Sequence, residues 1–284
     1  MERTANYVVA YEATERGQDA LELGIALARL TAAELRICLV LPQSTTVPAK
    51  VPASAADYEG IIAQQAQLWL DSAREKVPAG IVTTSHLLWA ESISEGLIEA
   101  AIAFDSDRII VGAARSGLLK RFTLGSVANA LLHASPIPVA LAPQGYRAPA
   151  RISRITCAVG TRPGWEALLD SMVAISAQLD VELRFVTLVE VDTETPRPRA
   201  SEAHLLTVLD YFTRRQSTGG TVSTAVAEGP TVEAAVENLR WRDDEVALVG
   251  SSRLASPSRI FLGATAHRML HSLPVPLIVV PNAH

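Results

Sequence analysis

Residues 111–126 read VGAARSGLLKRFTLGS, and residues 249–264 read VGSSRLASPSRIFLGA. Both segments begin where a short apolar run ends in a glycine, Gly112 or Gly250, and both have a further glycine 13 residues later, Gly125 or Gly263. Each continues through a helix-like stretch to a histidine, His133 or His271, and then to an apolar run that contains Pro-x-Pro. A repeat of this length indicates that the chain holds two copies of one domain.

The order of the repeated segment points to an anion. A strand, a glycine, a loop, a second glycine and a helix are typical of α/β proteins that present backbone N–H groups and a helix N-terminus to a phosphate. We therefore take Gly112, Gly125 and Ser126 as candidate binding residues. Two alternatives stay open, since Ser126 could serve only to cap its helix and Gly112 only to end a strand.

The composition fits two α/β domains. A chain of 284 residues is long enough for two domains of the usual size, roughly 100–200 residues each. Apolar residues make up 49% of it and aromatic residues only 5%, so the core must consist mainly of Ala, Val, Leu and Ile, as in buried parallel strands and their helices. The net charge is −5 and the basic residues are scattered, which argues against a nucleic-acid partner.

Targeting and cysteine signals point to the cytoplasm. No apolar run approaches the roughly 18 residues that cross a bilayer, and the N-terminus lacks the basic-then-apolar order of a signal peptide. We expect no membrane partner. Cys38 and Cys157 lie in apolar runs at non-equivalent places in the two copies, so we predict buried, reduced thiols rather than a disulfide or a metal site.

Hydrophobic periodicity predicts the same order of strands and helices in both copies. In the first copy we expect strands at 7–11, 35–41, 81–89, 108–111 and 139–141, and helices at 20–30, 57–76, 92–104 and 126–132. In the second copy we expect strands at 155–159, 181–189, 221–227, 246–249 and 277–280, and helices at 166–179, 201–215 and 231–241. This order predicts two doubly wound, five-stranded parallel sheets, each with a ligand crevice at the carboxyl ends of its strands.

The boundary between the copies falls in a stretch rich in Pro and Gly. We predict a first domain at 1–142, a linker at 143–151 and a second domain at 152–284.

The glycine segments resemble those of the universal stress protein family in its tandem two-domain form. Gly112, Gly125 and Ser126 fit the family pattern, and so do Gly250 and Gly263. The resemblance implies the family's Rossmann-like, flavodoxin-like fold. It also implies that the two copies pair through their final strands as an internal pseudo-dimer.

The resemblance further implies a nucleotide site in the first copy. Nucleotide-binding members hold ATP with an acidic residue at the end of the first strand, a place that Glu12 takes here and Gly160 takes in the second copy. Glu12 could accept a hydrogen bond from a ribose hydroxyl or help to hold Mg²⁺. Because the second copy also has Ala264 where the family has Ser or Thr, we predict that its site is degraded.

Arg115 and Arg253 stand where the family has its second glycine. A guanidinium at Arg115 could clamp phosphate, plug the site or simply face solvent, and these three alternatives stay open. His133 and His271 are expected near the ends of their helices in a structural role.

We predict a stress-response regulatory protein that binds ATP, with Mg²⁺, or another adenine nucleotide through Glu12, Gly112, Arg115, Gly125 and Ser126. The alternative is an interaction module of the same fold that binds no nucleotide. The protein partner, and any homodimer beyond the internal pair, are left open. Catalysis ranks last, as a slow ATPase at most, because the sequence shows no nucleophile with a dedicated base.

Overall fold

The computed structural model describes residues 3–43, 54–113, 124–161, 165–191, 198–216, 220–251 and 260–281. The first half contains, in chain order, β1 (Asn6–Ala10), α1 (Glu15–Thr31), β2 (Glu34–Pro42), α2 (Ser54–Glu75), β3 (Thr83–Ala90), α3 (Ile93–Ala103), β4 (Arg108–Gly112), α4 (Ser126–Ala134) and β5 (Val139–Ala142). The second half contains β6 (Arg154–Ala158), α5 (Glu166–Gln178), β7 (Glu182–Glu190), α6 (Pro198–Thr213), β8 (Val222–Gly229), α7 (Val232–Glu237), β9 (Glu245–Gly250), α8 (Ala264–Leu270) and β10 (Leu277–Val280). Each strand and helix that the hydrophobic pattern predicts is present.

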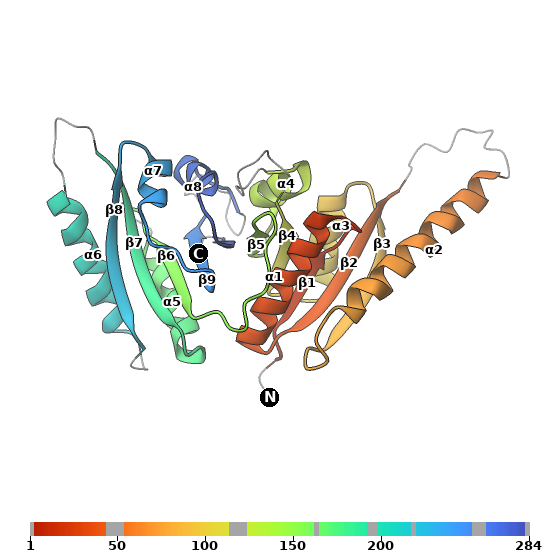
Figure 1. The fold of residues 1–284 in the computed structure, drawn as a ribbon, viewed down its shortest axis with the longest axis horizontal. Helices are drawn as coiled ribbons and strands as arrows, with labels where there is room; N and C mark the ends of the chain where they lie inside the picture. Colours follow the sequence, from red (N-terminus) through yellow and green to blue (C-terminus); the bar gives the residue numbers. More distant parts are fainter. Residues whose placement is uncertain are drawn as a thin grey trace.

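The strands form one ten-stranded sheet in the order β3-β2-β1-β4-β5-β10-β9-β6-β7-β8. Within each half every pair of neighbouring strands is parallel, whereas β5 and β10 pair antiparallel, with Ala140 opposite Ile278. Figure 1 shows the consequence: α2 and α6 lie towards the two ends of the molecule, and α4 and α8 lie near its centre. The prediction of an internal pseudo-dimer joined by the final strands is confirmed.

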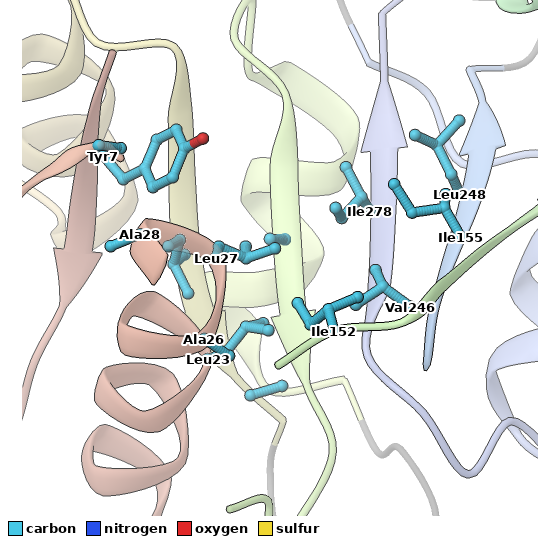
Figure 2. Packing of buried hydrophobic residues seen from close by; sticks show 14 of the residues in the cluster. Tyr7, Leu23, Ala26, Leu27, Ala28, Ile152, Ile155, Val246, Leu248 and Ile278 are labelled. Atoms are coloured by element: carbon cyan, nitrogen blue, oxygen red, sulfur yellow. The ribbon is translucent and has the colours of Figure 1, made fainter. Parts of the chain in front are cut away.

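The hydrophobic core on one face of the sheet continues from one half into the other. Leu27 on α1 and Ile152, in the segment that connects β5 to β6, belong to the same buried cluster as Val246 on β9 and Ile278 on β10 (Figure 2). Ile152 is 1% exposed and Tyr146 is 8% exposed, so the segment that connects β5 to β6 contributes to the core instead of crossing the surface freely. Burial of apolar surface on this scale is the main stabilising contribution to folding, and here it holds the two halves together.

The predicted ends of two helices are wrong. α1 begins at Glu15, ahead of the apolar periodicity that starts at Ala20, because the Thr14 side chain caps the helix by accepting a hydrogen bond from the Gly17 N–H. The first turn of α1 is polar, so apolar spacing cannot detect it. α7 ends at Glu237, short of the predicted Trp241.

The linker is attached along α1. The Asp19 carboxylate, on α1, accepts a hydrogen bond from the Gly145 N–H at 2.9 Å, and Glu22 accepts one from the Ala148 N–H at 3.0 Å. Burial raises the pKa of Asp19, while the contacts with Gly145 and Arg147 act in the opposite direction. The linker therefore has a defined path next to the first half.

No helix in the described ranges combines the length and the apolar character needed to cross a bilayer. Cys38 and Cys157 are both buried with free thiols, as predicted.

Candidate functional site

A cavity of about 210 Å³ opens at the carboxyl ends of β1, β2 and β4, three adjacent strands of the first half. This is the edge at which ligands bind in open parallel α/β sheets. Polar lining groups come from the segment after β1, the first turn of α1, the end of β4 and the start of α4, and they are Glu12, Arg16, Gly112 and Gly125. Apolar lining groups come mainly from β2 and the helices beside it, and they include Leu39, Leu41, Trp69, Ile93 and Leu97.

Close packing of α1 against β4 shapes the polar end. A Cβ added to Gly112 would lie 2.1 Å from the backbone oxygen of Arg16, so only glycine permits this approach. A Cβ on Gly17 would likewise lie 2.0 Å from the backbone oxygen of Glu12. Gly112 therefore brings the first turn of α1, and with it Glu12 and Arg16, to the rim of the cavity.

Glu12 does not face the cavity alone. Its carboxylate Oε1 accepts a hydrogen bond from Nε of Arg16 at 2.5 Å, and both side chains are partly exposed. The spacing of four residues could have suggested the pair. Sequence reasoning missed Arg16 because the predicted helix began after it. The pair leaves this end of the cavity with a cation as well as the expected acid.

The N-terminus of α4 forms another part of the polar end. Gly125 is the N-cap, it lines the cavity, and no side chain of the described residues caps the helix. The first N–H groups of a helix have no partners within it, and together with the helix dipole they favour an anion. Ser126 is exposed and is not among the residues lining the cavity. Arg115, together with Lys120 and Arg121 in the same segment, lies outside the described residues.

The apolar wall contains two titratable groups that are held neutral. Burial raises the pKa of the Cys38 thiol to about 12 and also raises the pKa of Tyr11. A thiol with so high a pKa is a poor nucleophile. Cys38 and Tyr11 therefore act as packing groups in this wall.

The second half uses its glycine segment differently. The backbone N–H groups of Ile260 and Leu262 donate to the carbonyl oxygens of Ser135 and Leu132, at 2.8 and 3.1 Å, on and just beyond α4 of the first half. Phe261, between them, places its ring 5.0 Å from that of His133. His133 thus has a packing contact between the halves, in line with its predicted structural role.

The acidic group has no counterpart there. Gly160 follows β6 at the place that Glu12 takes after β1, and Gly263 caps an α8 that begins with Ala264. Arg253 and Arg259 fall outside the described ranges. Among the residues that are described, no three His, Cys, Asp or Glu side chains are grouped to hold a metal ion.

A protein-family model, that of the universal stress protein family, matches residues 5–143 and, a second time, residues 151–281. The chain belongs to the universal stress protein family. Two matches in succession show that this universal stress protein carries its domains in tandem, in agreement with the repeated glycine segments.

Relatives of the same length support the assignment. A universal stress protein of Mycobacterium tuberculosis is 26% identical over 293 residues, which cover 97% of this chain and 99% of the relative. A universal stress protein structure from Archaeoglobus fulgidus aligns with a TM-score of 0.73 at 16% identity, over 99% of this chain and 100% of that one. A putative universal stress protein from Pseudomonas aeruginosa aligns with a TM-score of 0.59 at 17% identity, over 98% of this chain and 93% of that one. These structures share the fold of this universal stress protein.

Proposed function

We propose that this universal stress protein binds an adenine nucleotide, ATP or a related one, in the cavity of its first half. The observation that carries the proposal is the division of that cavity into an apolar part and a polar part. The apolar part can accept a base, while Arg16 and the uncapped N-terminus of α4 can accept phosphate groups. The cavity opens at the strand ends where such ligands bind in this class of sheet.

Each polar group has a proposed task. The first N–H groups of α4, starting beyond Gly125, would bind a phosphate, and Gly112 keeps the first turn of α1 close enough for Arg16 to take part. Glu12 would accept a hydrogen bond from a ribose hydroxyl, as an acidic residue does in dinucleotide-binding folds. Ser126, exposed at the first position of α4, would add its hydroxyl at the rim.

Mg²⁺ is a poor fit to the described lining residues. It prefers carboxylate, carbonyl and water oxygens, and the described lining residues include a single carboxylate, Glu12, which already bonds Arg16. We therefore propose nucleotide binding without a magnesium ion held by the protein. Binding rather than hydrolysis follows from the same observation, because no second carboxylate among the described lining residues can serve as a base.

The second half is proposed to lack a site. Gly160 offers no carboxylate, and residues 260–262 contact α4 of the first half. A protein built in this way would report the nucleotide state of its first half to a protein partner as part of a stress response. We place it in the cytoplasm, where buried free thiols such as Cys38 and Cys157 stay reduced.

Calorimetric titration of the nucleotide-stripped chain with ATP, with and without Mg²⁺, tests the proposal. We expect micromolar affinity and one site per chain. A Val127→Trp variant should abolish the heat because Val127 lines the cavity, whereas Thr265→Trp, at the matching position of α8, should leave it intact. No heat with millimolar ATP would overturn the proposal and favour the interaction module without nucleotide.

Arg115 needs a separate variant because it lies outside the described residues. If its guanidinium clamps phosphate, Arg115→Gly should weaken ATP binding; if it plugs the site, the variant should bind more tightly; a solvated side chain would leave the affinity unchanged. The clamp is the outcome that we propose.

A further inference from the structure

Trp69 forms a wall of the first-half cavity that no sequence motif predicts. It lies on α2 and lines the cavity together with Leu39 and Leu41 of β2 and Ile93 of α3. Its side chain is 40% exposed. A tryptophan that keeps so much of its surface in water gives up much of the stabilisation that burial would bring.

The packing of α2 against the core does not explain why a tryptophan stands at position 69. The helix buries Ala66, Leu70 and Ala73 completely, and these residues recur at the spacing of one helical face. Trp69 precedes Leu70 and lies at the margin of that face, where it reaches the cavity instead of the core. The ring is therefore available to a ligand.

The chemistry around Trp69 favours a flat, apolar group. Ile93 is also exposed, at 41%, and together with Leu39 it offers only apolar contacts. An indole stacks on any nucleobase, because every base has a π face. Arg16 and Gly125 lie at the other end of the cavity, on the side of β1 and β4, so a ligand that uses both ends needs a ring at one end and an anion at the other.

We propose that Trp69 stacks on the base of the nucleotide bound in this cavity and so determines which ligands bind tightly. The inference rests on the proposed function, since it assigns the base to a place within the same site. It adds a prediction that nucleotide binding alone does not make: the base and the phosphates depend on different side chains.

Trp89 is a matched control. It lies on β3, it is 43% exposed, and it is not among the lining residues. The chain contains four tryptophans, so the fluorescence change caused by ATP can be assigned by removing them one at a time. Because Trp69 and Trp89 are similarly exposed, Phe or Ala at either position should leave folding intact, which thermal unfolding followed by circular dichroism checks.

The experiment titrates the nucleotide-stripped full-length chain with ATP and with inorganic tripolyphosphate, which has no base. Trp69→Ala should weaken ATP binding by about tenfold, the lower part of the range expected for losing one base stack, and should leave tripolyphosphate binding unchanged. Trp69→Phe should retain most of the ATP affinity but lose the ATP-induced quenching of tryptophan fluorescence. Trp89→Phe should keep both.

Unchanged ATP affinity in Trp69→Ala, with quenching that persists in Trp69→Phe, would overturn the inference and leave the proposed function standing. Equal weakening of ATP and tripolyphosphate would also overturn it, since the side chain would then act on the whole site. If the unmodified chain binds no ATP at all, the proposed function itself fails and the role of Trp69 fails with it.

Discussion

The two halves of the molecule each have a glycine at the end of the fourth strand, Gly112 on β4 and Gly250 on β9, but the packing around the two glycines differs. At Gly112 an added Cβ would lie 2.1 Å from a backbone oxygen of α1, whereas at Gly250 the nearest atom of the described residues would be a methyl carbon of Leu168 at an ordinary 3.7 Å. A repeated motif therefore does not imply a repeated constraint. The first half holds α1 against the strand ends beside its cavity, and among the described residues of the second half no backbone atom comes equally close to Gly250.

At the amino ends of the strands, the second half has the more deeply buried contacts. In the second half, Glu245 is 1% exposed and bonds the guanidinium groups of Arg154 and Arg184, which are themselves buried. In the first half, Asp107 holds the corresponding place before β4, where it accepts a hydrogen bond from the Asn6 N–H and remains partly exposed. In the first half the closest packing thus lies near the cavity, at the carboxyl ends of the strands. In the second half the buried ion pairs lie at the amino ends of the strands.

The largest expected effect comes from removing Glu245. Glu245→Ala leaves two buried guanidinium groups without their carboxylate, and such a loss costs about 3–5 kcal/mol of unfolding free energy. Asp107→Ala should cost about 1 kcal/mol, because its partners are closer to water. Urea unfolding followed by circular dichroism measures both. Equal losses in the two variants would remove this contrast between the halves.

The glycine contrast predicts the next largest effect. Gly112→Ala forces α1 away from β4, so we expect a loss of about 1–3 kcal/mol in unfolding free energy and weaker ATP binding. Among the described residues, Gly250→Ala meets a flexible leucine side chain at an ordinary contact distance, and it should change stability by about 0.5 kcal/mol or less. The two variants are compared by urea unfolding and calorimetry. A Gly112→Ala protein as stable as the Gly250→Ala protein would show that α1 moves aside without cost.

The features that could be predicted from the sequence are those that repeat or that follow apolar spacing. The paired glycine segments predicted two α/β copies, and the resemblance to the family implied that the copies join through their final strands, which the pairing of Ala140 with Ile278 confirms. Such features depend on hydrophobic periodicity and on family pattern, both of which are local in the chain. The residues Glu12, Gly112 and Gly125 were singled out in the same way, and the structure places them around one cavity.

The features that could not be predicted depend on packing between distant segments. Arg16 lies in a polar first turn, and its place at the cavity follows from the approach of α1 to Gly112. Trp69 reaches the cavity only because of how α2 packs on β2 and β3. Arg154 is the first residue of β6, and Arg184 lies near the start of β7. A charged residue at such a place is usually solvated, but both bond the buried Glu245. Periodicity carries no information about any of these contacts.

A smaller effect is expected from Arg16. Arg16→Gln removes a cation from the polar end of the first-half cavity, so ATP and tripolyphosphate should both bind about tenfold more weakly, as expected for one charge-assisted hydrogen bond. This pattern differs from that of Trp69→Ala, which should affect ATP alone. Arg74→Gln, an exposed substitution on α2, controls for net charge. Loss of ATP binding without loss of tripolyphosphate binding would remove Arg16 from the phosphate end.

The smallest expected effect concerns the linker, which is bonded to the first half at Asp19. Burial raises the pKa of Asp19 in the folded protein, so the folded chain binds this proton more tightly than the unfolded chain does. The contribution of the protonated carboxyl to stability is therefore present at low pH and is lost as the pH rises through the folded-state pKa. Asp19→Asn does not titrate and keeps an oxygen that can accept from the Gly145 N–H.

The stability of the unmodified chain relative to Asp19→Asn should accordingly improve as the pH falls from 7 towards 4, as measured by urea unfolding at several pH values. A relative stability that worsens over the same range would mean that the contacts with Gly145 and Arg147 outweigh burial. The linker would then be held to α1 by a charged carboxylate, and the junction between the halves would weaken in acid instead of tightening.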